Sequence, residues 1–181
     1  TYLARPLSDG ITRAAALRLG ALFHDCAKPP TRSEEGEFIS FRGHDRIGAE
    51  RIERRFRELK ASRKLISYLA DLARHHLILG FMINSMPLDR RQFFAYLDRT
   101  DPVAIDVTLL TVADRMAARG TASIASEKMI AGHMELARQL IGHGLDWDRN
   151  GPPEQFMPGN ELAAALGIEP GPQLGEVMKE L

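Results

Sequence analysis

Two polar residues end an apolar run near the start of the chain. In LGALFHDCAKPP, residues 19–30, the adjacent His24 and Asp25 follow apolar side chains and precede Lys28. Imidazole nitrogens and carboxylate oxygens are ligands for divalent metal ions, and either group can also transfer a proton. A site of either kind requires further polar groups from elsewhere in the chain.

Two later segments place a polar side chain on an apolar helical face. At about 100° per helical residue, His76 and Asp114 each fall within an apolar stripe. The stripes are Leu65, Leu69 and Leu72 around His76, and Val103, Val107, Leu110 and Ala117 around Asp114. His75 lies about 100° from His76 and is either a ligand or an exposed neighbour. Three segments therefore direct polar groups at one interior.

A divalent metal ion explains this burial. An unpaired buried carboxylate costs several kcal/mol or becomes protonated, whereas a metal ion offsets its charge and also accepts neutral imidazoles. The candidate metal ligands are His24, Asp25, His44, His76 and Asp114, with His75 as an additional candidate. Asp25 and Lys28 are the candidate catalytic residues, since Lys28 could reach a bound phosphate. Isolated helical histidines are usually structural, and we assign His133 and His143 to that class.

The elements that must position these groups are helices. Periodicity near 3.6 residues dominates and β-branched alternation is nearly absent, which predicts an all-α fold. Expected helices cover residues 11–27, 44–59, 62–79, 101–120 and 126–141. Pro29 and Pro30 are expected to end the first helix, Ser62 and Ser126 to cap the third and fifth, and Asp101 to cap the fourth.

The composition changes near residue 142, where Gly, Pro and Asp become frequent. We expect a main helical domain over residues 1–143, a linker over 144–158, and a short helical tail over 159–181. The pattern of the tail predicts two brief helices around a Gly-Pro turn, and the tail is too small to fold alone. Its Gly171 is a candidate phosphate-binding residue, because backbone N–H groups at a helix start attract anions. A tight turn packed on the domain is the alternative.

Composition limits the classes of function. The 181 residues carry 24 Lys and Arg against 24 Asp and Glu, so a nucleic-acid contact must rest on a local patch. The stretch RIERRFRELKASRK, residues 51–64, offers one, and its candidate RNA-binding residues are Arg51, Arg54, Arg55 and Arg57. A merely solvated face is the alternative. One cysteine, Cys26, excludes an intrachain disulfide and suits a reducing cytoplasm, where we expect the protein. We find no membrane-spanning or signal-peptide pattern.

The motif order resembles that of a known superfamily. An HD pair, a Lys three residues on, a GH dipeptide, an HH pair and a later helical Asp resemble the HD-domain superfamily of metal-dependent phosphohydrolases, over roughly residues 14–120. The stretches LRLGALFHDCAKPPTR, FRGHDRIGAERIERRF and DLARHHL resemble the HD region of bacterial CCA-adding tRNA nucleotidyltransferases and poly(A) polymerase relatives. Gly and Pro positions between 159 and 175 match a C-terminal signature of that family.

The resemblance implies a fold and a metal content. It implies an HD-domain helical bundle with one or two divalent ions, drawn from Mn, Ni, Co, Mg, Fe or Zn. His24, Asp25 and Asp114 would bind one ion, His44 and His76 would serve a second, and Lys28 would assist at the phosphate.

The resemblance also implies an activity. The expected function is hydrolysis of phosphate esters, as a phosphatase or phosphodiesterase acting on nucleotides or RNA ends. One alternative is a catalytically incomplete HD scaffold that binds tRNA or other RNA. Another is a free-standing HD nucleotide phosphohydrolase, which is disfavoured because the HH pair precedes LILG rather than an acidic Gly-Tyr-Pro stretch.

Two family features have no counterpart in these residues. The polymerising head, with its Gly-Ser and paired-Asp motif, is missing, so we expect no nucleotidyl transfer from this chain alone and a head upstream in the full-length protein. The superfamily also supplies a ligand His on a helix before the HD pair. Because the chain opens with Thr1 rather than Met, we expect that this helix precedes it.

Overall fold

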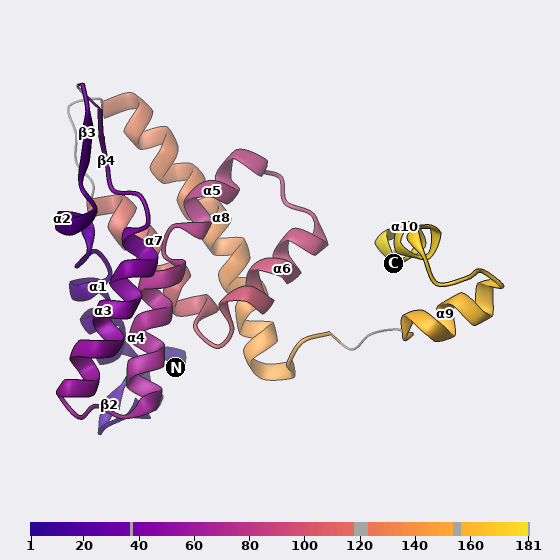
Figure 1. Ribbon diagram of the computed structural model, residues 1–181, viewed down its shortest axis with the longest axis horizontal. Helices are drawn as coiled ribbons and strands as arrows, with labels where there is room; N and C mark the ends of the chain where they lie inside the picture. The colour runs from indigo at the N-terminus through magenta and orange to yellow at the C-terminus, as the bar shows by residue number, and fades with distance from the viewer. Residues whose placement is uncertain (37, 118–122, 154–156, 181) are drawn as a thin grey trace. The chain divides into compact units, whose positions relative to one another are not determined.

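Helices form most of the described chain. The computed structural model describes residues 1–36, 38–117, 123–153 and 157–180, and it divides into two units, Thr1–Arg149 and Asn150–Leu181. The first unit contains α1 (Arg13–Phe23), α2 (Lys28–Thr31), α3 (His44–Glu58), α4 (Arg63–His75), α5 (Ile78–Met82), α6 (Arg90–Thr100), α7 (Ala104–Ala117) and α8 (Ser123–Asn150), which extends one residue beyond it (Figure 1). The 3₁₀ turns are η1 (Tyr2–Ala4) and η2 (Ile83–Ser85), and the second unit contains α9 (Gly159–Leu166) and α10 (Pro172–Glu180). The prediction of a helical bundle is confirmed.

Two short antiparallel hairpins were not expected from the sequence. β1 (Pro6–Ser8) pairs with β2 (Ile11–Thr12), and β3 (Ser33–Glu35) pairs with β4 (Phe38–Ser40). The second hairpin lies between the first two expected helices, which cover residues 11–27 and 44–59. Strands of two or three residues carry too little alternation to be recognised in a sequence, and they leave the helical class unchanged.

Local capping decides where several helices begin. The side chain of Ser62 accepts a hydrogen bond from the backbone N–H of Leu65 at 3.2 Å, which confirms Ser62 as the cap of α4. The first helix ends at Phe23, earlier than predicted. Pro29 and Pro30 do not end it; they lie in the first turn of α2, where a proline needs no backbone N–H.

The region between α5 and α7 differs from the prediction. The helix predicted over 62–79 is divided into α4 and α5. Helix α6 lies where no helix was predicted. A capping box starts α6, in which Asp89 accepts from the Gln92 backbone N–H at 2.8 Å and the Gln92 side chain accepts from the Asp89 N–H at 3.0 Å. Asp101 ends α6 rather than starting α7, which begins at Ala104. The predicted end of that helix, Gly120, lies outside the described residues.

Helix α8 is longer than expected at both ends. It begins at Ser123, ahead of the predicted cap Ser126, and it continues to Asn150 through the start of the predicted 144–158 linker. Tertiary contacts explain the extension: the Trp147 ring lies 5.3 Å from that of Phe94 in α6, and the His143 ring lies 4.5 Å from that of Phe93. Packing of this kind outweighs the low helix propensity of glycine.

The core of the first unit is centred on α4. Leu69 and Leu72 of α4 are fully buried, and the helix packs against α3, α1 and α7. Burial of a leucine side chain contributes roughly 1.5–3 kcal/mol. A side chain on Gly20 of α1 would collide with Leu72, so the glycine permits close approach of α1 to α4. This packing gathers the ends of α1, α3 and α4.

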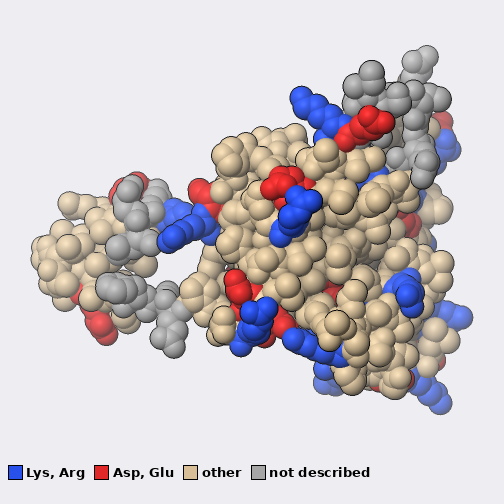
Figure 2. Space-filling view, turned by 180° about the vertical axis from the view of Figure 1, so that it is seen from behind, with Lys and Arg blue, Asp and Glu red and all other residues tan. Residues whose placement is uncertain are grey.

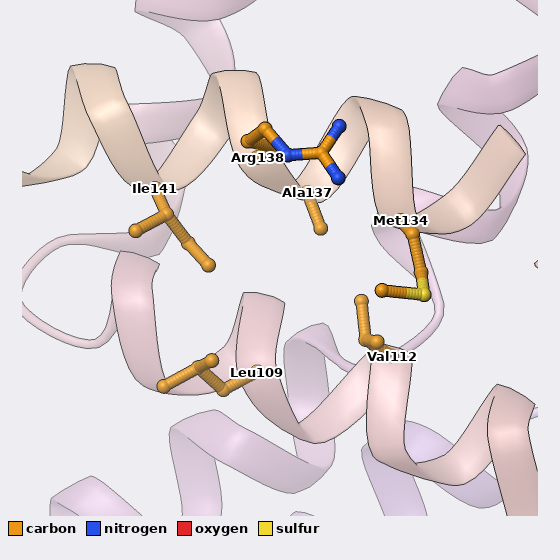
Figure 3. Close-up of a pocket in the computed structure, with 6 residues that line it drawn as sticks. All are labelled: Leu109, Val112, Met134, Ala137, Arg138 and Ile141. Atoms are coloured by element: carbon orange, nitrogen blue, oxygen red, sulfur yellow. The ribbon is translucent and has the colours of Figure 1, made fainter. Parts of the chain in front are cut away.

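An apolar hollow of about 270 Å³ lies between α7 and α8. Figure 3 shows Leu109 and Val112 of α7 facing Met134, Ala137 and Ile141 of α8 across it. The one charged lining residue, Arg138, pairs with Glu135 at 2.5 Å. Within the described residues, no helix is both long and apolar enough to cross a membrane.

Candidate metal centre

Three histidines are held by the same kind of backbone hydrogen bond. The Nδ1 atoms of His24, His44 and His76 each contact the carbonyl oxygen three residues earlier, at 2.9, 2.6 and 2.7 Å. A carbonyl oxygen only accepts, so each Nδ1 carries the proton and donates it. The Nε2 atom of each neutral ring is then left with a free lone pair, which is the form that binds metal ions.

These Nε2 atoms meet around the carboxylate of Asp25. Its Oδ2 lies 3.3 Å from His24 Nε2, and its Oδ1 lies 3.3 Å from His44 Nε2 and 3.6 Å from His76 Nε2. His44 Nε2 and His76 Nε2 are themselves 3.2 Å apart. The end of α1, the start of α3 and the end of α4 thus supply one cluster.

Asp114 lies at the rim of this cluster. Its Oδ1 is 3.6 Å from His24 Nε2, and its side chain is 43% exposed. The apolar stripe of α7 is buried at Val107 and Leu110 but is exposed at Ala117. The expectation that Asp114 is buried is therefore wrong, although the expected proximity to His24 is found.

The donor set fits a cation. His24 Nε2 and Asp25 Oδ1 are buried and have no hydrogen-bond partner. An unpaired buried acceptor of this kind costs about 1–3 kcal/mol. His24, Asp25 and His76 each offer a ligand atom, and these atoms lie within 4.8 Å of one another. These ligand atoms direct their lone pairs toward one another without enough hydrogen-bond donors to satisfy them. A divalent ion bound between them would stabilise this arrangement.

Charge within the cluster shifts several pKa values. Burial would raise the pKa of Asp25, but His24 and Lys28 hold it well below its usual range. Burial would lower the pKa of His24, but Asp25 and the Ala21 carbonyl raise it. Burial dominates at His76 and lowers its pKa, which favours the neutral ring. The carboxylate and the His76 imidazole are thus held in their metal-binding forms.

Lys28 lies beside this cluster. Its Nζ donates to Asp25 Oδ2 at 2.5 Å, and its side chain remains 39% exposed. The ammonium group therefore holds the carboxylate in place, and the partly exposed side chain remains accessible to a negatively charged ligand.

Comparison with known proteins identifies the fold. The model of the HD domain family matches residues 1–119, about two thirds of the chain. The chain belongs to the HD-domain family.

Two curated relatives refine this relationship. The chain is 34% identical to the A-adding tRNA nucleotidyltransferase of Deinococcus radiodurans over 167 residues, covering 91% of this chain and 36% of the relative. It is 30% identical to the CC-adding tRNA nucleotidyltransferase of Thermus thermophilus over 166 residues, covering 91% and 34%. The predicted resemblance is confirmed, and the chain spans about a third of the length of these relatives.

The remaining histidines lie outside the cluster formed by His24, Asp25, His44 and His76. His75 has Asp71, Arg74, Arg99 and Asp45 as its charged neighbours, and burial lowers its pKa. Its Nδ1 is buried without a hydrogen-bond partner. The structure therefore does not bring the additional candidate His75 to the other proposed ligands.

His133 and His143 make local contacts. The Nδ1 of His133 bonds the Met129 carbonyl at 2.8 Å, and the His143 ring packs on Phe93. Neither contact involves the cluster.

A second buried polar group in the HD domain was not predicted from the sequence. Asp106 in α7 is fully buried and accepts from Tyr2 at 2.7 Å, from Tyr68 at 2.9 Å, and from Arg13 at 2.5 and 3.1 Å. Its position between Ile105 and Val107 was the available signal. This network joins the start of α1 to α4 and α7, the helices that carry the cluster.

The candidate RNA-binding residues are accessible. Arg51, Arg54, Arg55 and Arg57 are exposed on α3. Arg55 pairs with Glu58 at 3.0 Å, and Figure 2 shows basic and acidic side chains interspersed over the face in view. In the second unit, exposed Gly171 precedes α10, and its carbonyl accepts from the Gly175 N–H at 3.1 Å.

Proposed function

We propose that this HD domain is a metal-dependent phosphohydrolase that cleaves phosphate esters of nucleotides or RNA ends. The observation that carries the proposal is the meeting of three Nε2 lone pairs at the Asp25 carboxylate, with buried ligand atoms left unpaired. Membership of the HD-domain family and similarity to tRNA nucleotidyltransferases support a phosphate-ester substrate.

The ligand atoms suggest which residues would hold the ions. His24, Asp25 and Asp114 would hold one divalent ion. His44 and His76 would serve a second where one is present. Nitrogen and carboxylate ligands suit Mn, Fe, Co, Ni or Zn, and Mg only where oxygen ligands dominate.

The residues of the chain have separate tasks in this reaction. A divalent ion held here supplies Lewis acidity, which activates water and polarises the phosphoryl group. The Nδ1 hydrogen bonds hold the three imidazoles in the ligand tautomer. Lys28 keeps Asp25 ionised and in place, and its exposed ammonium would stabilise charge that develops on the phosphoryl oxygens.

Metal add-back tests the proposal. Protein stripped with a chelator should be inactive on bis-p-nitrophenyl phosphate and on a 2′,3′-cyclic nucleotide, and one of the six metals should restore turnover. Asp25→Ala should remain inactive with every metal, whereas Asp98→Ala, an exposed aspartate on α6, should behave as wild type. Equal activity of Asp25→Ala and wild type would defeat the proposal.

RNA binding is a second candidate function, favoured by the exposed arginines of α3. In this proposal Arg54, Arg55 and Arg57 contact RNA phosphates, and Gly171 adds backbone N–H groups. Charge reversal of all three arginines to Glu should weaken tRNA binding and flatten its salt dependence, since each phosphate contact releases counterions. Binding should persist in chelator. Unchanged binding after charge reversal would exclude these residues from the interface.

The relatives suggest the larger context. Their names describe addition of A or CC to tRNA, and this chain spans about a third of their length. We propose that it forms the HD region of a tRNA nucleotidyltransferase-like protein whose polymerising head lies elsewhere in the full-length chain.

A further inference from the structure

A second hollow lies beside the ends of the helices that carry the metal cluster. It measures about 370 Å³ and is lined by the first turn of α3, the end of α4, α5 and the end of α6. Asp45 and Leu77, which line it, directly follow His44 and His76 in the chain. None of its lining residues belongs to the cluster, so the two sites share helix ends but no side chain.

One wall of the hollow is apolar and carries an accessible aromatic ring. Leu77, Ile78 and Met82 line this wall, and Phe81 of α5 adds a ring that is 72% exposed. So large an apolar side chain, exposed at a pocket, is available for contact with a ligand. An aromatic ring of this kind stacks on a nucleobase, which is planar and apolar on its faces.

The lining also supplies charged groups. Arg74 is engaged by Asp71 at 2.5 Å and by Glu53 at 3.0 Å, which fixes its guanidinium. Arg99 is exposed, and among the described residues its guanidinium forms no ion pair or hydrogen bond. A guanidinium left open at a pocket binds phosphate oxygens through paired N–H groups.

Asp45 narrows the class of ligand. A carboxylate in the lining repels a bare polyanion, but it accepts hydrogen bonds from a ribose hydroxyl or an amino group. The volume falls within the range of small-molecule pockets. The lining therefore suits a ligand that contains a planar ring for Phe81, hydroxyl groups for Asp45 and one phosphate for Arg99.

We propose that this hollow binds a nucleoside phosphate, as a free mononucleotide or as the end of a single-stranded RNA. The base stacks on Phe81, the phosphate lies against Arg99, and Asp45 accepts from the sugar. The site needs no metal ion, so it goes beyond the proposed hydrolase.

A titration of the 181-residue chain with adenosine monophosphate, followed by NMR in the presence of chelator, tests the inference. Shifts should saturate and concentrate at residues of the hollow. Inorganic phosphate should bind at least about tenfold more weakly, because it lacks the stacking base. Adenosine monophosphate that fails to saturate at millimolar concentration, or phosphate that binds equally well, would overturn the proposal.

Matched variants locate the contact. Phe81→Ala and Arg99→Ala should each weaken binding about tenfold, and both residues are exposed, so folding is retained. Phe38→Ala, a ring 70% exposed on β4, and Arg90→Ala on α6 should bind as wild type. Equal effects of the test and control variants would refute the site.

Two further measurements distinguish a free nucleotide from an RNA end, and binding in the hollow from binding at the metal centre. A short oligoadenylate that binds about tenfold more tightly than the mononucleotide identifies an RNA end, and equal affinity identifies a free nucleotide. Asp25→Ala should leave binding unchanged. Loss of nucleotide binding in Asp25→Ala would assign the ligand to the metal centre and overturn the inference, whatever the fate of the hydrolase activity.

Discussion

His44 and His76 face each other through their Nε2 atoms at 3.2 Å, although each ring already donates its Nδ1 proton to a backbone carbonyl. When both rings are neutral, two lone pairs therefore point at one another. A proton or a metal ion must lie near both atoms for this geometry to be stable.

Replacement of His76 tests this geometry. His76→Leu should abolish stabilisation by added Ni²⁺, which in wild type should reach about 2.7 kcal/mol at a concentration 100 times Kd. The melting temperature with and without metal measures this. His143→Leu, which alters a histidine outside the cluster, should respond to Ni²⁺ as wild type does. An equal response from His76→Leu would show that His76 is not a ligand.

The buried pair of Arg13 and Asp106 should dominate the electrostatic contribution to stability. Arg13→Met leaves a fully buried carboxylate without its cation, which costs about 3–5 kcal/mol. Arg5 pairs with Asp148 from a half-exposed position, so Arg5→Met should cost at most about 1 kcal/mol. Urea denaturation measures both. Similar losses in the two variants would contradict the assignment.

Gly20 should tolerate no side chain. Gly20→Ala places a Cβ against the side chain of Leu72. The overpacking should lower the free energy of unfolding by about 1–3 kcal/mol, which exceeds the roughly 1 kcal/mol gained in helix propensity. Gly142→Ala in α8 meets no atom within 4 Å and should stabilise the protein by up to about 1 kcal/mol. Thermal unfolding should give opposite signs, and a stabilising Gly20→Ala would show that α1 can move away from α4.

Stability should fall at alkaline pH. Burial, together with Asp106, raises the pKa of Tyr68 above its ordinary value of 10.0, so the folded chain keeps a proton that the unfolded chain releases. The resulting stabilisation is complete below pH 10 and is lost as the pH rises toward the folded-state pKa.

Tyr68→Phe isolates this effect. The variant loses the hydrogen bond to Asp106, which should lower the free energy of unfolding by about 1.5–3 kcal/mol at neutral pH. It should also reduce the slope of stability against pH above 10. Urea midpoints measured between neutral and alkaline pH provide the test, and an unchanged slope would exclude Tyr68 as its source.

Much of the helical framework could be predicted because its signals are local. Apolar periodicity located α3, and periodicity together with Ser62 located α4. Helix α6 and the end of α8 were missed, since their stability depends on ring contacts such as Trp147 with Phe94. Those partners are far apart in the sequence, and helix propensity carries no information about them.

By itself, the sequence determined which ligand groups are available: an HD pair, a GH dipeptide and an HH pair supply imidazole and carboxylate groups, and helical periodicity places His76 on an apolar face while His75 stays either a ligand or an exposed neighbour. Only the tertiary structure decided that three Nε2 atoms meet at Asp25, that Asp114 stays at the rim, and that Asp106 is enclosed by its four donor groups. The physical reason is that periodicity fixes the direction of a side chain within one helix. Whether side chains from separate helices meet depends on how closely those helices pack, as Gly20 permits between α1 and α4.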